Sequence, residues 1–451
     1  MELSRYTSPL VSCHSHRKEL KMNCNTKLSA ITEQTLIVGI DVAKNIHVAR
    51  AIDDRGNELC EKIKFENTRE GFCSFLSEVE RLKDLHIKQD VIIGLEPTGI
   101  YGHALIAYLQ DAGLHVVYVL GMQVKRSKEL EDNSPSKNDI KDARVIASLV
   151  KNGYYYKIRN HTKEIIELKE ATRFAYQITK KLVRVKCQIK NCLTEYFPEF
   201  TIAFKSVEGT YGARPNKTAL ITLHLFPFPN QLNTLTAEQI VSAWRAAGVI
   251  KGIGLKKAEQ LKQLATNSIG LFASDSVQLK FKCLIKEYDF LMSQEREIWG
   301  KIGALVETNA DFQAIMKIPN MSLRLGAYLL SEIGDIRDFS HPQQLVRLAG
   351  LNLKECSSGK NRGVSEITKR GRPMLRRVLY FIILEQLKRA APGWHQLHKY
   401  YTCRKDRPLK KMQSIIVLCC KFLRVVWAML NNGTPFDPDM LLRKNAHPKT
   451  A

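Results

Sequence analysis

Short apolar runs separated by polar turns mark the first part of the chain. Two runs, 36–40 and 47–52, flank a short turn, and a third run, 58–65, follows the polar turn 53–57. Runs of this length bounded by Gly, Asn and Asp are typical of strands joined as hairpins. The pattern predicts a three-stranded antiparallel meander. Residues 1–33 are polar and lack periodicity, so we expect a disordered extension there.

Helices and strands alternate after this meander. Apolar residues at helical spacing predict helices over 69–84 and 101–113. The runs 91–96 and 115–120 are apolar almost throughout, which is typical of strands covered on both faces. A further helix is predicted to start at Asp139 or at the residue before it. Three antiparallel strands followed by this alternation give the element order of a ribonuclease H-like α/β domain.

The second half of the chain is predicted to be mostly helical. Residues 160–197 form a long basic helical stretch, and 277–308 carries an apolar stripe at helical spacing. These two helices could pair as an antiparallel or intermolecular coiled coil, and a plain helical bundle fits the pattern equally well. The predicted fold class is therefore α/β plus all-α.

A short glycine-containing turn, KGIGLKKAEQL, lies between the long helices at 251–261. Gly252 and Gly254, followed by Ala and Leu at helical spacing, resemble a helix-hairpin-helix. In such a hairpin the glycines expose backbone N–H groups to a phosphate without reading bases. The same turn can also be a plain packing corner, so both interpretations stay open.

These patterns divide the chain into seven parts. They are an extension (1–33), an α/β domain (34–155), a basic helix (156–200), an inserted helical segment with the glycine turn (201–270), a coiled-coil-like helix (271–312), a mostly helical C-terminal domain (313–440) and a tail (441–451).

The charge of the chain points to a polyanionic partner. Lys and Arg number 69 against 45 Asp and Glu, a net charge of +24. From His341 onward, 22 basic residues face only 6 acidic ones, a net charge of +16. A basic surface of this size favours nucleic acid over a merely solvated face.

Other classes are disfavoured by composition. No apolar stretch reaches membrane-spanning length, and the first residues lack the apolar segment of a signal peptide. The 11 cysteines are scattered, without the C-x-x-C spacing of a zinc site. We therefore expect no membrane association, no disulfides and a reducing, cytoplasmic location.

Four carboxylates form a candidate metal site. Asp41 and Glu96 end the apolar runs LIVGID and VIIGLE, and Asp139 and Asp142 lie three residues apart on one predicted helix. If sheet and helix pack as in ribonuclease H-like folds, these carboxylates converge, and a cation must neutralise them. Oxygen ligands select Mg²⁺ or Mn²⁺. Taken singly, each residue could also be a turn or cap residue.

A second candidate site is the basic segment CSSGKNRGVSEITKRGRPMLRR at 356–377. A serine hydroxyl here could attack phosphorus and store the bond as a phosphoserine. On the residues alone, a basic loop that contacts DNA explains the segment as well. The candidate phosphate-binding residues are Lys360, Arg362, Lys369, Arg370, Arg372, Arg376 and Arg377.

Four motifs together resemble one family. GIDVAK, E-P-T-G-x-Y and K-N-D-x-x-D-A-R-x-I-A occur in the first half, and GDIRDFSHPQQLVRLAGL…SSGK…ITKRGRPMLRRVLY in the second. The chain, over about 35–440, resembles the transposases of the insertion sequence 110 / 1111 type, which include pilin-gene-inverting recombinases. The resemblance implies a RuvC-like first domain with a DEDD metal site, here Asp41, Glu96, Asp139 and Asp142.

The resemblance also implies a reaction and partners. In that family a serine directly before a glycine, here Ser358, is the nucleophile, and half-sites are joined across protomers of a dimer or tetramer. Members act on element ends and target DNA in the prokaryotic nucleoid, guided by a structured noncoding RNA of the element. One departure is Pro319-Asn320-Met321-Ser322, where the family often has P-G-I-G. Asn tolerates left-handed backbone, so we expect the turn to be preserved.

Three functions follow from these observations. The first is a transposase and site-specific recombinase that cuts and rejoins DNA through a serine-linked intermediate, with an RNA guide. The alternative is a metal-dependent RuvC-like endonuclease that resolves junctions by hydrolysis and needs no serine. The third is a non-catalytic nucleic-acid-binding protein. All predicted ligand and nucleophile positions carry suitable residues, which argues against this third function.

Overall fold

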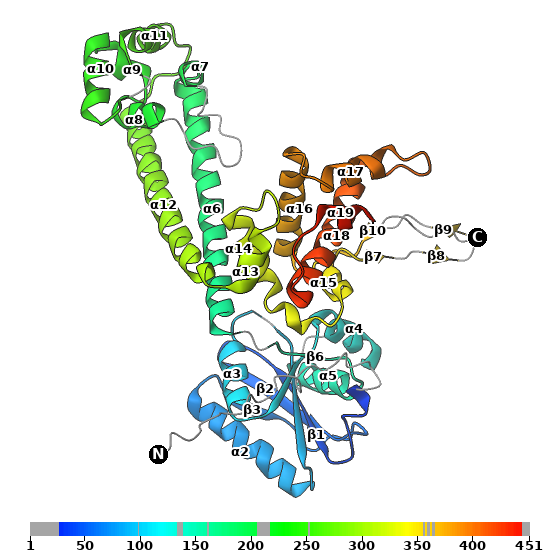
Figure 1. Cartoon of the computed structure of the whole chain (residues 1–451). Coiled ribbons are helices and arrows are strands. Elements are labelled where there is room, and N and C mark those ends of the chain that lie inside the picture. The colour runs from blue at the N-terminus through cyan, green and yellow to red at the C-terminus, as the bar shows by residue number, and fades with distance from the viewer. Residues whose placement is uncertain are drawn as a thin grey trace, which may run out of the picture. The chain divides into compact units, whose positions relative to one another are not determined.

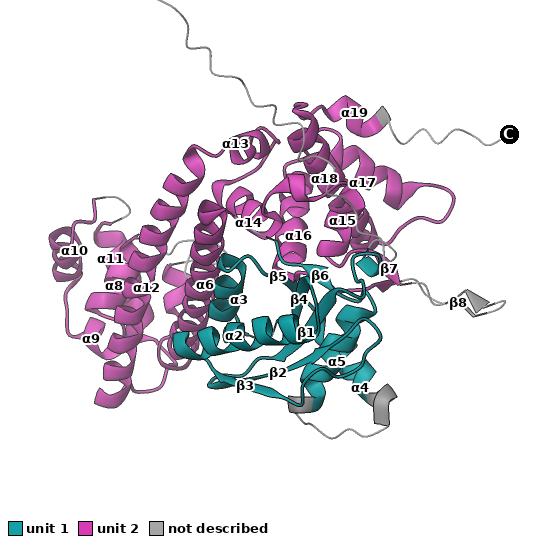
Figure 2. Ribbon diagram, turned by 90° about the horizontal axis from the view of Figure 1, so that it is seen from below, with its two compact units in different colours: residues 1–160 teal, residues 161–451 magenta. Residues whose placement is uncertain are grey.

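The computed structural model divides into two compact units, residues 1–160 and 161–451 (Figure 2). Unit 1 is α/β, and unit 2 is built almost wholly of helices (Figure 1). The residues that the structure describes are 27–97, 99–132, 139–159, 162–204, 217–250, 253–354, 357–358, 361–362 and 366–443.

Unit 1 contains a six-stranded mixed sheet in the order β3-β2-β1-β4-β5-β6. The first three strands are antiparallel, β4 and β5 run parallel to β1, and β6 is antiparallel to β5. This arrangement confirms the predicted meander followed by buried strands. The strands are β1 (Thr35–Asp41), β2 (Ile46–Ile52), β3 (Ile63–Glu66), β4 (Asp90–Leu95), β5 (His115–Tyr118) and β6 (Tyr156–Lys157).

The third strand is shorter than the predicted run 58–65. Only Ile63–Glu66 is a strand, and Glu58 forms an isolated bridge to Ile52. The side chain of Glu58 makes ion pairs with Arg50 and Arg144. The side chain of Glu58 is thus held by two arginines, and the strand itself begins only at Ile63.

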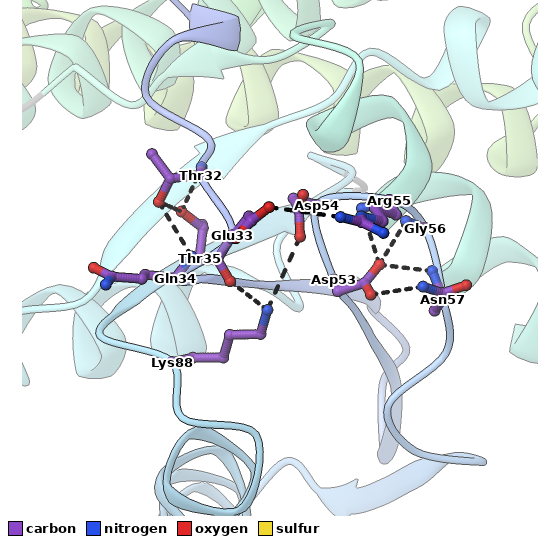
Figure 3. Close-up of polar contacts among 10 residues, drawn as sticks. All are labelled: Thr32, Glu33, Gln34, Thr35, Asp53, Asp54, Arg55, Gly56, Asn57 and Lys88. Carbon is purple, nitrogen blue, oxygen red and sulfur yellow. Dashed lines mark hydrogen bonds and ion pairs between the residues drawn. The ribbon is translucent and has the colours of Figure 1, made fainter.

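The turn before Glu58 is held by one carboxylate (Figure 3). Asp53 Oδ1 accepts hydrogen bonds from the backbone N–H groups of Arg55 (2.9 Å), Gly56 (2.7 Å) and Asn57 (2.7 Å). Its Oδ2 accepts from the Asn57 side chain at 2.8 Å. Gly56 has a φ of 97°, which glycine adopts without strain. The predicted polar turn therefore owes its shape to Asp53.

Helices cover both faces of the sheet. Alternate residues of β1 point to opposite faces: Leu36, Val38 and Ile40 pack with α2 and α3, whereas Ile37 packs with α4 and α5. Phe75 of α2 is fully buried in the first of these layers. The helices are α2 (Arg69–Leu85), α3 (His103–Asp111), α4 (Gly121–Asp132) and α5 (Asp139–Lys151).

Two glycines let α5 approach the sheet closely. Gly39 of β1 and Gly94 of β4 are register partners on neighbouring parallel strands. A Cβ on Gly39 would overlap the backbone oxygen of Ala143 and lie 2.5 Å from the backbone nitrogen of Ala147. A Cβ on Gly94 would overlap Val150. The backbone of α5 therefore lies directly on Gly39, and its Val150 side chain lies on Gly94.

Unit 2 contains a long antiparallel helix pair, α6 and α12 (Figure 1). Both helices agree with the stretches predicted at 160–197 and 277–308, and they pair within the chain. Short helices between them close one end of the pair, around the buried Trp244. The elements are α6 (Lys163–Tyr196), α7 (Phe200–Ala203), α8 (Lys217–Leu225), α9 (Pro229–Asn233), α10 (Ala237–Ala246), α11 (Leu255–Thr266) and α12 (Asp275–Glu307).

The remainder of unit 2 is a second helical core with two small antiparallel ribbons. One pairs β7 (Leu353–Lys354) with β10 (Glu366–Ile367), and the other pairs β8 (Ser357–Ser358) with β9 (Asn361–Arg362). Its helices are α13 (Ala310–Met316), α14 (Leu323–Ile333), the 3₁₀ turn η3 (Ile336–Asp338), α15 (Pro342–Leu348), α16 (Pro373–Lys388), α17 (Trp394–Cys403), α18 (Lys411–Asn432) and α19 (Pro438–Arg443).

The central helix of this core is α18. It is the one described helix that is long and apolar enough to cross a membrane. Leu418, Phe422, Leu423 and Val426 on it are fully buried in the protein, and α15, α16 and α17 pack against it. Burial by neighbouring helices accounts for its apolar character.

The turn at Pro319-Asn320 keeps the backbone that the sequence predicts. Asn320 has a φ of 59°, in the left-handed region. Ser322 then caps α14, because its hydroxyl accepts a hydrogen bond from the backbone N–H of Leu325 at 3.3 Å. Asn therefore replaces glycine here without loss of the turn.

The glycine contact gives a stability prediction. We expect Gly39→Ala to lower the free energy of unfolding of unit 1 by about 1–3 kcal/mol, because the added methyl group overlaps helix backbone rather than a movable side chain. Urea unfolding measures the effect. The control is Gly300→Ala in α12, where nothing lies within 4 Å of the added Cβ. That variant should be neutral or slightly stabilising. A Gly39→Ala protein as stable as wild type would contradict the close packing.

Candidate functional site

Asp41 and Glu96 lie side by side at one end of the sheet. Ile40 of β1 and Leu95 of β4 are register partners, and each carboxylate is the next residue along its parallel strand. Both carboxylates are half-buried. The structure therefore places these two predicted ligands at the carboxyl edge of the sheet, where α/β folds bind ligands.

Asp142 is a buried carboxylate on the helix that packs against this edge. It precedes Ala143, whose carbonyl faces Gly39, two residues before Asp41. Only 6% of Asp142 is exposed, and its Oδ1 forms an ion pair with the Lys128 ammonium of α4. A buried charge requires such a partner. Lys128 therefore supplies the positive charge next to this predicted ligand.

The helix α4 contacts two of the predicted ligands. Its eighth residue is Lys128, and its first residue, Gly121, lies against Glu96: a Cβ on Gly121 would overlap Glu96 Oε1. The positive end of a helix dipole favours a carboxylate in this position. Neither contact was predicted, because each depends on how α4 packs and not on a spacing in the sequence.

The four carboxylates do not form a complete metal site in the described part of the chain. No three Asp, Glu, His or Cys side chains there stand close enough to hold one ion. Asp139 begins α5, one turn before Asp142, and its side chain lies outside the described residues. The all-oxygen donor set suits Mg²⁺ or Mn²⁺.

His47 supports the turn that follows Asp41. It is fully buried in β2, next to Phe65 and Phe72, with ring-centroid distances of 5.1 and 6.2 Å. Its Nδ1 accepts a hydrogen bond from the backbone N–H of Ala43 at 3.2 Å. Burial lowers the pKa of His47, so the ring is neutral as this hydrogen bond requires. Sequence reasoning did not single out this histidine.

Ser358 lies on a short antiparallel ribbon in unit 2. β8 (Ser357–Ser358) pairs with β9 (Asn361–Arg362), with Ser357 opposite Arg362 and Ser358 opposite Asn361. The side chains of these residues, and the whole of Lys360, lie outside the described part. The ribbon places the basic residue of β9 across from the serine pair.

Three arginines of the predicted phosphate-binding segment have partners within the protein. Arg372 donates a hydrogen bond to the Glu332 carbonyl, and its burial lowers its pKa. Arg376 donates to the Ala349 carbonyl at 2.9 Å. Arg377 donates to the Tyr176 hydroxyl at 2.8 Å and lies over that ring. Lys369 and Arg370 are exposed.

The glycines of the two basic segments 251–261 and 356–377 are placed differently. Gly371 packs on protein backbone, because a Cβ there would overlap Gly350 N and Leu348 O. Gly254 precedes α11 with a φ of 173° and open space around it. Gly252 lies outside the described residues.

The Lys128–Asp142 ion pair gives a second prediction. We expect Lys128→Met to lower the free energy of unfolding by about 1–3 kcal/mol, because it leaves Asp142 buried without its partner. The matched control is Lys125→Met on the same helix, whose side chain is exposed. Urea unfolding of both variants, and of Lys128→Met with Asp142→Asn, measures the coupling. No coupling between positions 128 and 142 would contradict the ion pair.

The buried histidine gives a pH prediction. Because the folded-state pKa of His47 lies below its ordinary value, the unfolded chain binds the proton more tightly. Stability is therefore retained above about pH 6.5 and lost as the pH falls below it, by at most about 1.4 kcal/mol per pH unit for one group. His115, whose pKa burial also lowers, adds to the wild-type slope. We expect His47→Gln to reduce that slope in urea unfolding between pH 5 and 7. An unchanged slope would show that His47 does not contribute.

Comparison with known proteins places these elements in one family. A family model described as a transposase of the DEDD, IS110 type matches residues 38–198, and one described as the transposase IS116/IS110/IS902 family matches 312–401. The first match contains Asp41, Glu96 and Asp142, and the second contains Ser358.

Relatives cover nearly the whole chain. The 44.8 kDa protein of insertion element IS116 from Streptomyces clavuligerus is 24% identical over 89% of this chain and 96% of its own length. The IS110 protein of Streptomyces coelicolor is 22% identical over 90% of this chain and 96% of its own length. A pilin gene-inverting protein of Moraxella bovis is 25% identical over 33% of this chain and 46% of its own length. The chain belongs to the IS110 family of transposases.

Proposed function

We propose that this transposase cuts and rejoins DNA strands with a RuvC-like metal site in unit 1 and the nucleophile Ser358 in unit 2. One observation carries the proposal. Asp41 and Glu96 follow register-paired residues of neighbouring parallel strands, and the helix bearing Asp142 packs directly on Gly39 and Gly94. Carboxylates from separated segments thus gather at one edge of a sheet in the region that the first family model matches.

The carboxylates Asp41, Glu96 and Asp142, together with Asp139, would hold Mg²⁺ or Mn²⁺. When bound, such an ion withdraws charge from a phosphodiester and lowers the cost of its attack. Lys128 keeps Asp142 neutralised before the ion enters. The electrostatic repulsion among the carboxylates is then small in the free protein. Lys128 of α4 pairs with Asp142, and the positive N-terminal end of α4 lies against Glu96.

Ser358 would form the covalent link to DNA. Its Oγ forms a bond to phosphorus while a deoxyribose oxygen leaves. The hydroxyl gives up its proton, and the leaving oxygen takes up a proton. The number of phosphate ester bonds is unchanged, so the strand can be rejoined without external energy. Arg362 of β9 lies opposite Ser357, the neighbour of Ser358, in the ribbon. Its charge would favour a phosphate at this ribbon.

A guide RNA and an assembly of several protomers belong to the same proposal. Exposed cations on α6, at Lys180, Lys181 and Arg184, offer a surface for RNA. The long α6–α12 pair offers a surface for a second copy of the chain. Because the metal site and the serine lie in different units, partner protomers could each contribute one of them.

The serine separates strand transfer from hydrolysis. We expect Ser358→Ala to abolish cleavage and recombination of the element's own DNA in Mg²⁺, whereas Ser357→Ala, its neighbour, retains some of each. Mass spectrometry of peptides from a trapped reaction should find a nucleotide attached to Ser358. An active Ser358→Ala variant that releases free 5′-phosphates without a protein–DNA adduct would establish the hydrolytic nuclease instead.

Variants of the metal site and the RNA provide the matching controls. Asp41→Asn and Glu96→Gln should stop cleavage while DNA binding persists, because the basic surface is elsewhere in the chain. Full cleavage by either variant in Mg²⁺ would remove that residue from the site. Recombination that is undiminished after complete removal of RNA would exclude the guide.

A further inference from the structure

In the segment 369–377 of the C-terminal core, Lys369 and Arg370 are exposed, and the other three cations have partners within the protein. Three arginines of that segment donate to protein oxygens, as described above. By contrast, the segment 399–411, KYYTCRKDRPLKK, carries six basic residues and one acidic residue. Five of its cations are exposed, and no ion pair to them occurs among the described residues: Lys399, Lys405, Arg407, Lys410 and Lys411. We call 399–411 the cationic loop.

The cationic loop has a defined backbone. Its residues 399–403 end α17, 404–410 connect α17 to α18, and Lys411 begins α18; the connection projects from the two helices in Figure 1. Arg404 Nε donates to the carbonyl of Arg407 at 2.8 Å, and the backbone N–H of Leu409 donates to the Tyr401 carbonyl at 2.9 Å. Arg407 adopts a φ of 50°, which is rare for a residue with a side chain. The cations are therefore presented on a fixed turn.

The charges of this loop oppose the helix that follows it. Lys410 is the N-cap of α18, Lys411 is its first residue, and no acidic residue lies in the first turn. Positive charge at the positive end of a helix is unfavourable. A bound polyanion would reverse this repulsion, since it would interact with the side chains and the helix end together.

We propose that the cationic loop binds the phosphate backbone of double-stranded DNA. Single-stranded nucleic acid and RNA loops are usually held by several stacking aromatic side chains. Here Tyr400 is exposed, but Tyr401 packs on the protein core. Several cations with a single free aromatic ring suit backbone binding that does not read sequence. This inference rests on the proposed function, because it takes DNA as the substrate.

The test compares two triple variants with the same reduction of charge. One is Lys405→Gln, Arg407→Gln and Lys410→Gln in the full chain. The control is Lys62→Gln, Lys64→Gln and Arg69→Gln, three exposed cations of unit 1. Fluorescence anisotropy with a short DNA duplex is measured over a range of salt concentrations, and thermal melting by circular dichroism shows that each variant folds.

We expect the loop variant to bind duplex DNA on the order of 10- to 100-fold more weakly at low salt. The slope of log affinity against log salt should fall by roughly 0.9 for each phosphate that the variant no longer neutralises. The affinity should fall equally for element ends and for a scrambled duplex. The control variant should change little.

Three outcomes would overturn the inference. In the first, the loop variant binds duplex DNA with wild-type affinity and salt slope. In the second, its affinity falls for the element's structured RNA alone, which would assign the loop to RNA. In the third, the affinity of the control variant for duplex DNA falls as much as that of the loop variant. Failure of the proposed function is separate: it would appear as Asp41→Asn protein that still cleaves DNA, whatever the loop variant binds.

Discussion

The arrangement of unit 1 depends on one close contact between a helix and a sheet. Gly39 and Gly94 lie side by side on parallel strands. The backbone of α5 occupies the space that a side chain at Gly39 would fill, and Val150 of α5 occupies the space at Gly94. This contact fixes the height of α5 above the sheet and brings Asp142 near the strand that ends at Asp41. A larger residue at Gly39 would lift the helix and separate the carboxylates. Packing and chemistry therefore depend on the same two residues.

That close contact buries the negative charge of Asp142, and α4 supplies the opposite charge in the free protein. Asp142 is buried by the packing of α5, and a buried carboxylate without a partner would cost several kcal/mol. Lys128 provides the opposite charge, and the start of the same helix lies against Glu96. The proposed metal ion would take over part of this neutralisation.

The sequence predicted the parts of this fold that periodicity controls. The apolar runs ending at Asp41 and Glu96, the long helices α6 and α12, and the left-handed Asn320 all have local causes. The shortened β3 was missed: Glu58 still bridges to Ile52, and the strand is interrupted before Ile63. Lys128 and His47 were missed because their roles arise only when separate elements pack. The positions of Asp41 and Glu96 at neighbouring strand ends were predictable, but the Lys128 charge that balances Asp142 was not.

The basic C-terminal third shows why a count of charges does not locate a binding surface. A run such as KRGRPMLRR looks like a phosphate site, yet the guanidinium groups of Arg372, Arg376 and Arg377 donate to carbonyls and a tyrosine hydroxyl of the helical core. Arg376 binds Ala349 O, and the adjacent backbone packs through Gly350 and Gly371, so these residues hold two segments together. Such bonds direct the donors inward and leave little for a ligand. An exposed lysine at a helix start has no such inward partner and is unfavourably placed until an anion arrives. Where cations without ion-pair partners repel their own helix, binding a polyanion relieves the repulsion. Segment 399–411 meets this condition and 372–377 does not, so 399–411 is the better candidate for a DNA-binding surface.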